Sequence, residues 1–379
     1  MQSKLPDVGT TIFTVMSKLA QDHNAINLSQ GFPDFDCPDR LKELVSYYLN
    51  DRRNQYPPMT GIPALREQIA KKVFDYYGYQ ADPETEVTVT SGATEALFDA
   101  IQAVVSAGDE VIVFDPAYDS YEPSVALAGG KTVHIPLSQP EYSIDWQRVE
   151  ESINDRTRLI IINSPHNPCG SLLGDADFES LAGIIRECNI LVLSDEVYEH
   201  MVYDGMKHKS VLSHPELKNK SFAVFSFGKT YHATGWKLAY CIAPQNLSEE
   251  FRKIHQFVTF TSSSFVQYAI ADFMNECPEH ALELPAFYQK KRDYFCSLMK
   301  DSRFTFTPSG GTYFQLLDYS QISDLDDMEF NLYLTKEKGV AAIPLTPFYE
   351  AAPGSKVLRF CFCKDDSTLE QAAEILCEL

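Results

Sequence analysis

The middle of the chain alternates short runs of consecutive apolar residues with stretches of helical periodicity. Residues 159–162 and 190–193 are apolar without a polar interruption. A strand that is apolar throughout must be covered on both faces, so this pattern predicts an α/β fold with a mostly parallel sheet between helices. Strands are expected at residues 86–90, 110–114, 157–163, 189–194, 222–225 and 238–242, with a helix over 93–105.

The pattern changes after about residue 280. A helix is expected over 285–300, strands at 304–306, 312–317 and 357–363, and a final helix from Ser367, where Glu370 would complete a capping box. A helix over 11–21 is expected to join this unit, because terminal segments often pack together. We therefore predict three parts: residues 1–45 joining the small domain, residues 46–280 as the large domain, and residues 281–379 as a small α+β domain.

Composition excludes several classes of partner. The net charge is −21 and no run of Lys or Arg occurs, which disfavours nucleic acid and anionic membranes. No apolar stretch approaches the roughly 20 residues of a membrane span. The nine cysteines include no C-x-x-C pair, and His166 has no ligand at metal-binding spacing, so we expect no metal site. This cysteine usage fits a reducing, cytoplasmic location.

Polar residues follow several of the apolar runs, where an open α/β sheet binds its ligands. Lys229 follows the run 222–225, and Asp195 follows the run 190–193. A lysine can form a Schiff base with an aldehyde, and a carboxylate can hold a ring nitrogen protonated. Pyridoxal 5'-phosphate (PLP) needs both groups, so the pair predicts a PLP site. Asp195 could instead cap the turn that follows it.

Three further features fit such a site, each with a simpler alternative. The small residues at 91–94 join a strand to a helix and suit a phosphate, although many such turns bind nothing. Tyr118 could stack on a cofactor ring or merely pack. Arg359 lies in an apolar strand and could grip a substrate carboxylate or form an internal salt bridge.

Residues 27–35, 54–56 with Gly61, and 226–236 carry a resemblance to a known family. The chain resembles the class I/II aminotransferases with the aspartate-aminotransferase-type PLP fold nearly end to end. Within that family it is most similar to the methionine and kynurenine aminotransferases. The resemblance implies the PLP-dependent transferase fold with a seven-stranded sheet, and a homodimer with shared active sites.

The resemblance also assigns roles to individual residues. Lys229 would carry the Schiff base, Asp195 would pair with the ring nitrogen, and Tyr198 would bond the ring 3'-oxygen. The other implied cofactor residues are Gly92, Ala93, Thr94, Tyr118, Asn167, Ser226, Lys237 and, from the neighbouring subunit, Tyr56. The implied substrate residues are Gly31, Asn167, Arg359 and Phe260, the last across the dimer. One departure is Cys169, where the family commonly has threonine.

These roles predict a ping-pong transamination between an amino acid and a 2-oxo acid, in which Lys229 moves the Cα proton. The resemblance favours methionine or another large apolar or aromatic donor. Two alternatives would use the same site: a cysteine-conjugate β-lyase and a kynurenine-type aminotransferase. A PLP-binding regulator would normally need a DNA-binding domain, for which the chain has neither room nor a basic patch.

Overall fold

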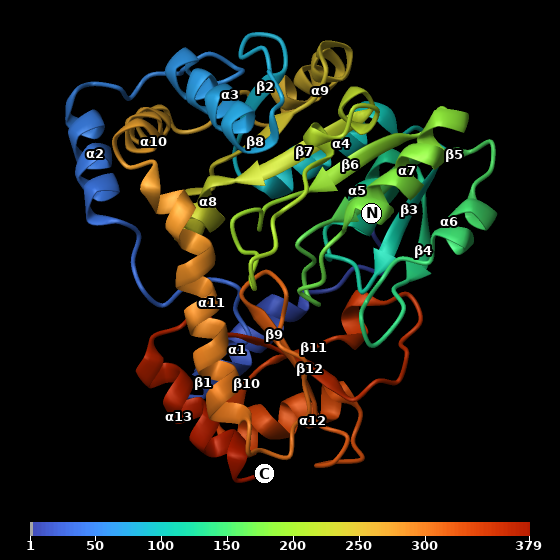
Figure 1. Cartoon of the computed structure of the whole chain (residues 1–379), viewed down its shortest axis with the longest axis vertical. Helices are drawn as coiled ribbons and strands as arrows, with labels where there is room; N and C mark the ends of the chain where they lie inside the picture. The colour runs from blue at the N-terminus through green and yellow to red at the C-terminus, as the bar shows by residue number, and fades with distance from the viewer. Residues whose placement is uncertain (1–2) are drawn as a thin grey trace.

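The computed structural model describes residues 3–379 and is built around a seven-stranded sheet (Figure 1). The strands, in spatial order, are β2 (Val87–Thr90), β8 (Ala239–Ile242), β7 (Ser221–Ser226), β6 (Leu191–Asp195), β5 (Thr157–Asn163), β3 (Glu110–Asp115) and β4 (Lys131–Pro136). All neighbours run parallel except β8, which is antiparallel to both β2 and β7. The predicted mostly parallel, seven-stranded sheet is confirmed.

Helices cover both faces of this sheet, which explains the uninterrupted apolar runs. In β5, Leu159 and Ile161 pack on one face, while Ile160 and Ile162 pack on the other. The first face is covered by α4 (Ala93–Val104), α5 (Tyr121–Ala128) and α9 (Gln245–Val258). The second is covered by α2 (Asp39–Asn50), α3 (Pro63–Tyr77), α6 (Trp146–Ser152), α7 (Asp175–Glu187) and α10 (Ser264–Glu276).

A smaller α+β part combines the two ends of the chain. Its helices are α1 (Ile12–Asp22), α11 (Glu279–Met299), α12 (Asp327–Tyr333) and α13 (Asp366–Cys377), and its antiparallel sheet has the order β11 (Ile343–Pro344), β12 (Val357–Cys361), β9 (Phe314–Asp318). Strand β1 (Ile26–Asn27) pairs in parallel with β10 (Val340–Ala341). Figure 1 shows blue α1 and β1 among the orange and red C-terminal elements. The N-terminal segment therefore belongs to this part.

The connecting segments contain short helical turns. These are α8 (Phe227–Thr230), 3-10 turns at Val211–Ser213, Leu217–Asn219, Thr234–Trp236 and Thr346–Phe348, and a π-helical segment at Leu334–Lys338. No helix among residues 3–379 is long and apolar enough to cross a membrane.

The packing of α2 bears on where the large domain begins. Leu41 and Leu44 are buried in the same core as α3 and α10. Most of the buried apolar residues of the small part form a separate core, which includes Leu284 and Phe360. We therefore propose that the large domain begins near residue 38, upstream of the boundary at residue 45 that the sequence suggested.

Two helix ends differ from expectation. The helix expected from Pro285 begins at Glu279 and runs through the proline. Leu284 and Tyr288 are buried on one face of this helix, and that packing holds it across Pro285. The final helix begins at Asp366, so the predicted capping box at Ser367 is wrong. Its expected partner, Glu370, instead accepts a hydrogen bond from the hydroxyl of Tyr294.

Two strands also differ. The strand expected at 304–306 is reduced to a single bridge between Thr305 and Asp318. Strand β4 had no counterpart among the predicted segments because it lies at the sheet edge, where only Ile135 of its side chains is buried. An edge strand lacks the continuous apolar signal of a strand covered on both faces.

Candidate active site

A cavity of about 250 Å³ lies where the carboxyl ends of β6 and β7 and the N-terminus of α4 face the small part. Most of the residues singled out in the sequence line it: Gly31, Gly92, Ala93, Thr94, Tyr118, Asn167, Asp195, Tyr198, Ser226, Lys229, Lys237 and Arg359. Of the residues given a cofactor or substrate role, Tyr56 and Phe260 do not line it. The fold thus brings most of the predicted residues to one place, from segments as far apart as residues 31 and 359.

Lys229 lies in the short helix α8, directly after β7. Its Nζ donates to the carbonyl oxygen of Gly31 at 3.1 Å and to the hydroxyl of Tyr313 at 2.7 Å. Tyr313 in turn donates to the same carbonyl oxygen. Burial lowers the pKa of Lys229 to about 8, because a charged amine is poorly solvated there. Near neutral pH a larger fraction of Lys229 is therefore a neutral, nucleophilic amine than of an ordinary lysine, whose pKa is 10.5.

Asp195 ends β6 and is buried. It accepts a hydrogen bond from the Tyr121 hydroxyl at 2.7 Å, and no lysine, arginine or histidine of residues 3–379 forms an ion pair with it. Burial raises the pKa of Asp195 to about 6, although the bond from Tyr121 works in the opposite direction. A buried carboxylate without a cation is costly, so Asp195 is suited to a ligand that brings a positive charge or a donor.

Arg359 in β12 is only 1% exposed. Its Nη1 donates to Asn167 Oδ1 at 2.8 Å and its Nη2 to the Ser29 carbonyl oxygen at 2.8 Å, while Nε has no partner. The guanidinium carbon lies 3.9 Å from the centre of the Phe314 ring. Arg359 forms no ion pair with a carboxylate of residues 3–379, so the internal salt bridge left open by the sequence is absent there. A buried guanidinium without a counter-ion is suited to an incoming carboxylate.

The turn at residues 91–94 forms one end of the cavity. Gly92 has φ of +89°, a backbone conformation that favours glycine, and Lys237 Nζ lies close to it, 3.1 Å from where a Cβ would be. Helix α4 begins at Ala93, and the N–H groups of a first helical turn have no partner within the helix. With Lys237 and Ser226 also lining the cavity, this end has the donors and positive potential that an anion needs.

Two tyrosines line the cavity near Asp195. Tyr118 packs edge-on against Tyr121, with ring centres 5.6 Å apart, and burial raises the pKa of its hydroxyl to about 12. Tyr198 packs edge-on against Tyr313 at 5.2 Å, and burial holds its pKa above the ordinary value. Both phenols are therefore neutral near pH 7 and able to donate hydrogen bonds.

Tyr56 and Phe260 lie outside this cavity, in contact with each other. Their ring centres are 5.8 Å apart in an edge-on arrangement, and the two residues are 86% and 41% exposed. Within this one chain neither residue lines the cavity. Cys169 also does not line it, so the departure from threonine leaves the cavity wall unchanged.

The structure adds two residues that sequence reasoning missed. Tyr121 bonds Asp195, and Tyr313 bonds Lys229. Both contacts join residues more than 70 positions apart in the chain. Tyrosine is frequent in this sequence, so nothing local distinguished these two from the others.

Comparison with known proteins identifies the family of this chain. The family model "Aminotransferase class I and II" matches residues 23–376. The chain is 52% identical to a methionine aminotransferase of Escherichia coli, over 100% of this chain and 98% of that protein. It is 35% identical to human kynurenine–oxoglutarate transaminase 3, over 98% of this chain and 89% of that protein.

Solved structures show the same relationship. An E. coli crystal structure identified with a methionine aminotransferase function superposes with a TM-score of 0.98 at 52% identity, covering 100% of this chain and 99% of that one. An N-succinyldiaminopimelate aminotransferase from Mycobacterium tuberculosis superposes with a TM-score of 0.96 at 35% identity, with coverage of 100% and 99%. Family, sequence and three-dimensional structure agree over nearly the whole length, and this chain belongs to the class I and II aminotransferases.

Proposed function

We propose that this aminotransferase uses PLP to move an amino group from methionine, or another large apolar or aromatic amino acid, to a 2-oxo acid. The observation that carries the proposal is the presence of Lys229, Asp195 and Arg359 in one cavity. They supply an amine for the cofactor aldehyde, a carboxylate for its ring nitrogen and a cation for the substrate carboxylate.

The residues of the cavity fit PLP. Asp195 is buried without a cationic partner, and a protonated ring nitrogen would supply one. The turn beside Gly92, together with Lys237 and Ser226, would hold the 5'-phosphate. Tyr118, which also lines the cavity, would pack on the ring. When bound, PLP supplies a ring that withdraws electrons and stabilises negative charge at the substrate Cα.

The chain's own residues would do the remaining work. Lys229 would accept the Cα proton and return it on the cofactor side, a task suited to an amine whose pKa burial lowers to about 8. While it is free, Lys229 has partners in Tyr313 and the carbonyl of Gly31. Arg359 would hold the α-carboxylate of both substrates with Asn167, which fixes the position of Cα.

The lining of the cavity supports an apolar donor. Phe13, Phe32, Leu97 and Phe314 contribute apolar surface. The cationic side chains among the described lining residues are Lys229, Lys237 and Arg359, and each already has a proposed role. None is left to bind a second carboxylate, which disfavours aspartate as the main donor. The name of the E. coli relative points the same way.

We further propose a homodimer in which Tyr56 and Phe260 reach the partner's cavity. Supporting this, both are exposed in the single chain, and the neighbouring Phe257 is 84% exposed. Sedimentation velocity should give a dimer, and a monomer with full activity would contradict the shared site. A cytoplasmic location is supported by the nine cysteines, all of which are free thiols.

The function is tested by single-turnover absorbance on the purified PLP form without an acceptor. Methionine, phenylalanine, kynurenine, glutamate and aspartate are each added separately. Conversion of the cofactor to its amine form with release of the matching 2-oxo acid is expected, fastest with methionine or another large apolar or aromatic donor. If cysteine conjugates instead yield pyruvate and ammonia while the cofactor spectrum recovers, the enzyme is a β-lyase and the transamination proposal fails.

A further inference from the structure

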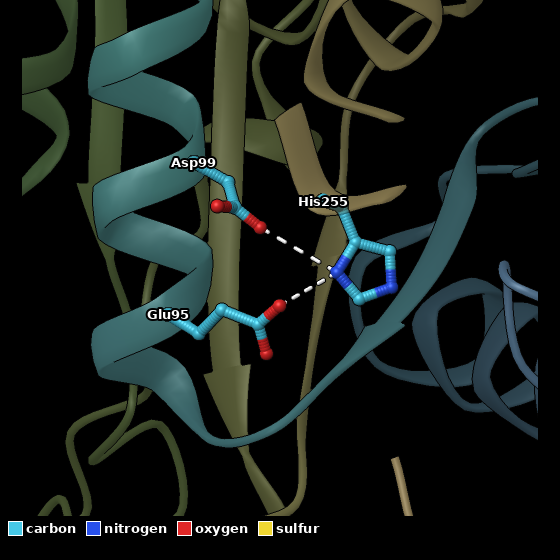
Figure 2. Close-up of side chains that lie close together, drawn as sticks. All are labelled: Glu95, Asp99 and His255. Atoms are coloured by element: carbon cyan, nitrogen blue, oxygen red, sulfur yellow. Dashed lines mark hydrogen bonds and ion pairs between the residues drawn. The ribbon is translucent and has the colours of Figure 1, made fainter. Parts of the chain in front are cut away.

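Three buried ionisable side chains lie beside the turn at 91–94 but outside the cavity. Glu95 and Asp99 are on α4, and His255 is on α9. Figure 2 shows both carboxylates directed at one nitrogen of the imidazole. His255 Nδ1 lies 2.7 Å from Glu95 Oε1 and 3.5 Å from Asp99 Oδ2. The His255 and Asp99 side chains are fully buried, and both oxygens of Asp99 lack a hydrogen-bond partner.

The contacts of the ring identify its protonation state. His255 Nε2 lies 3.0 Å from the Met59 carbonyl oxygen, which can only accept, so Nε2 carries a hydrogen. Nδ1 faces the two carboxylates and must also carry a hydrogen to donate to Glu95. Burial opposes a charged imidazole, but Asp99 and Glu95 outweigh it and raise the pKa of His255 to about 9. His255 is therefore a buried cation at neutral pH.

The same distances argue against a metal ion. Two ligands of one tetrahedral ion with bonds of 2.0–2.2 Å lie roughly 3.3–3.5 Å apart. The 2.7 Å between His255 Nδ1 and Glu95 Oε1 is instead the length of an N–H···O hydrogen bond. A proton, and not a metal, fits between these two atoms.

Glu95 connects this cation to the phosphate turn. Its second oxygen, Oε2, accepts a hydrogen bond from the backbone N–H of Ser91. Ser91 begins the turn whose next residues, Gly92 to Thr94, line the cavity. The bond from His255 fixes the Glu95 carboxylate, and the Glu95 carboxylate fixes the first N–H of the turn.

His255 also holds two other segments. Through Nε2 it binds the carbonyl of Met59, three residues after Tyr56. Its own carbonyl accepts from the N–H groups of Thr259 at 3.1 Å and Phe260 at 2.9 Å, where α9 ends and Phe260 adopts a φ of +71°. The His255 side chain therefore joins the phosphate turn to the segment that carries Tyr56, and its backbone carbonyl caps the end of α9 beside Phe260.

We propose that His255, acting through Glu95, is a positioning residue that holds the turn at residues 91–94 in the geometry that binds the cofactor's 5'-phosphate. The proposal rests on the proposed function, because that function places the phosphate there. In this proposal His255 does not contact the cofactor. Replacing His255 should therefore weaken binding of the phosphate group and not binding of the cofactor ring.

Cys241 and Arg252 lie near the cluster, but neither places a charge against His255, so Glu95 and Asp99 determine its protonation. Glu95 and Asp99 face His255 from α4. Cys241 of β8 lies towards Asp99, and burial raises the pKa of its thiol, so it remains neutral. Arg252, one turn before His255 on α9, donates to Thr88 and to carbonyls of residues 84 and 87, away from the ring.

The test compares two variants, each of which keeps one of the two hydrogen bonds that the His255 ring makes. In His255→Asn the amide nitrogen takes the position of Nδ1 and can still donate to Glu95. In His255→Gln the amide nitrogen takes the position of Nε2, towards Met59, and the bond to Glu95 is lost. The control is His134→Asn, since His134 Nδ1 lies 2.8 Å from Asp115 Oδ1 in a similar pair on β4, far along the sheet from the turn.

Each full-length apoprotein is titrated spectroscopically with PLP and with pyridoxal, which lacks the phosphate. We expect His255→Gln to weaken PLP binding about tenfold, the effect of one lost hydrogen bond, and pyridoxal binding less than about twofold. His255→Asn should recover most of the loss, and His134→Asn should match the wild type. Equal weakening of both ligands, or none, in a folded His255→Gln protein overturns the proposal.

Two further readouts keep the test decisive if His255→Gln does not fold. Glu95→Ala removes the acceptor of the Ser91 N–H, so it should raise the PLP-to-pyridoxal ratio of dissociation constants as His255→Gln does, and an unchanged ratio contradicts the proposal. One equivalent of divalent metal in the purified wild type that is absent from His255→Asn also contradicts it. If the wild type binds no PLP at all, the proposed function itself fails instead.

Discussion

The substitution Arg359→Lys keeps a positive charge in the cavity but removes the planar guanidinium group, which donates hydrogen bonds in two directions. In the structure Nη1 bonds Asn167 and Nη2 bonds the Ser29 carbonyl, so two donors are already spaced for two acceptors. A single ammonium can replace one of these directions and not both. Loss of one hydrogen bond to a charged group costs about 1.5–3 kcal/mol, which corresponds to a fall in kcat/KM of roughly 10- to 150-fold.

The assay measures kcat/KM for methionine and for its decarboxylated amine, together with the dissociation constant of PLP. The preference for methionine over the amine should shrink by the same factor, because only methionine carries the carboxylate. PLP affinity should be unchanged. Arg292→Lys is the matched control, since Arg292 of α11 is also buried but pairs with Asp204, away from the cavity. An unchanged preference for methionine would refute the carboxylate role of Arg359.

The remaining predictions concern other groups of the site. Lys229→Ala should bind PLP but show no turnover by single-turnover absorbance; appreciable turnover would exclude it as the proton carrier. Asp195→Asn should retain PLP yet lower kcat by about 100-fold or more, as expected for loss of a group that stabilises a charged state; near-normal kcat would exclude the ring-nitrogen role. Schiff-base formation between the apoprotein and pyridoxal should accelerate as pH rises through about 8, because burial lowers the pKa of Lys229 to that value; stopped-flow rates that are independent of pH would contradict this. The pKa of His255 is raised in the folded state from an ordinary 6.5 to about 9, so its stabilising effect is full below pH 6.5 and lost through pH 9; the difference in Tm between wild type and His255→Asn should narrow over that range, and a constant difference would contradict a charged His255.

The strand-end rule predicted much of the cavity because its logic is local. A polar residue that ends a buried apolar run must face the carboxyl edge of a parallel sheet. Asp195 at the end of β6 and Lys229 just beyond β7 are of this kind, and these strands are neighbours in the sheet. Proximity of the two side chains therefore follows from strand order, without knowledge of any other contact.

The rest of the site depends on contacts that no local pattern encodes. Gly31 and Arg359 meet in the cavity because the N-terminal segment packs along β12, where the Cys361 N–H donates to the Leu28 carbonyl at 2.8 Å. The final helix shows the same effect. Its first turn is held by Asp34, which accepts from the N–H of Asp365, and not by the predicted capping box. These contacts join residues more than 300 positions apart in the sequence, and the local periodicity of a sequence carries no signal for such tertiary contacts.

The site therefore has residues carried by the large sheet and residues brought in by tertiary contacts, and the second group is the one expected to determine substrate specificity. Relatives whose names carry three different substrates are 35–52% identical to this chain over nearly its whole length, so we expect the sheet, with the cofactor residues proposed on it, to be common to enzymes of different specificity. The apolar side chains Phe13, Phe32 and Phe314 come instead from the N-terminal segment and the small part. Phe13 and Phe314 lie next to Arg359, which holds the carboxylate common to every substrate in the proposed mechanism. Changing these rings should therefore alter which side chain is accepted while leaving cofactor binding intact, and the N-terminal segment is the first place to redirect specificity.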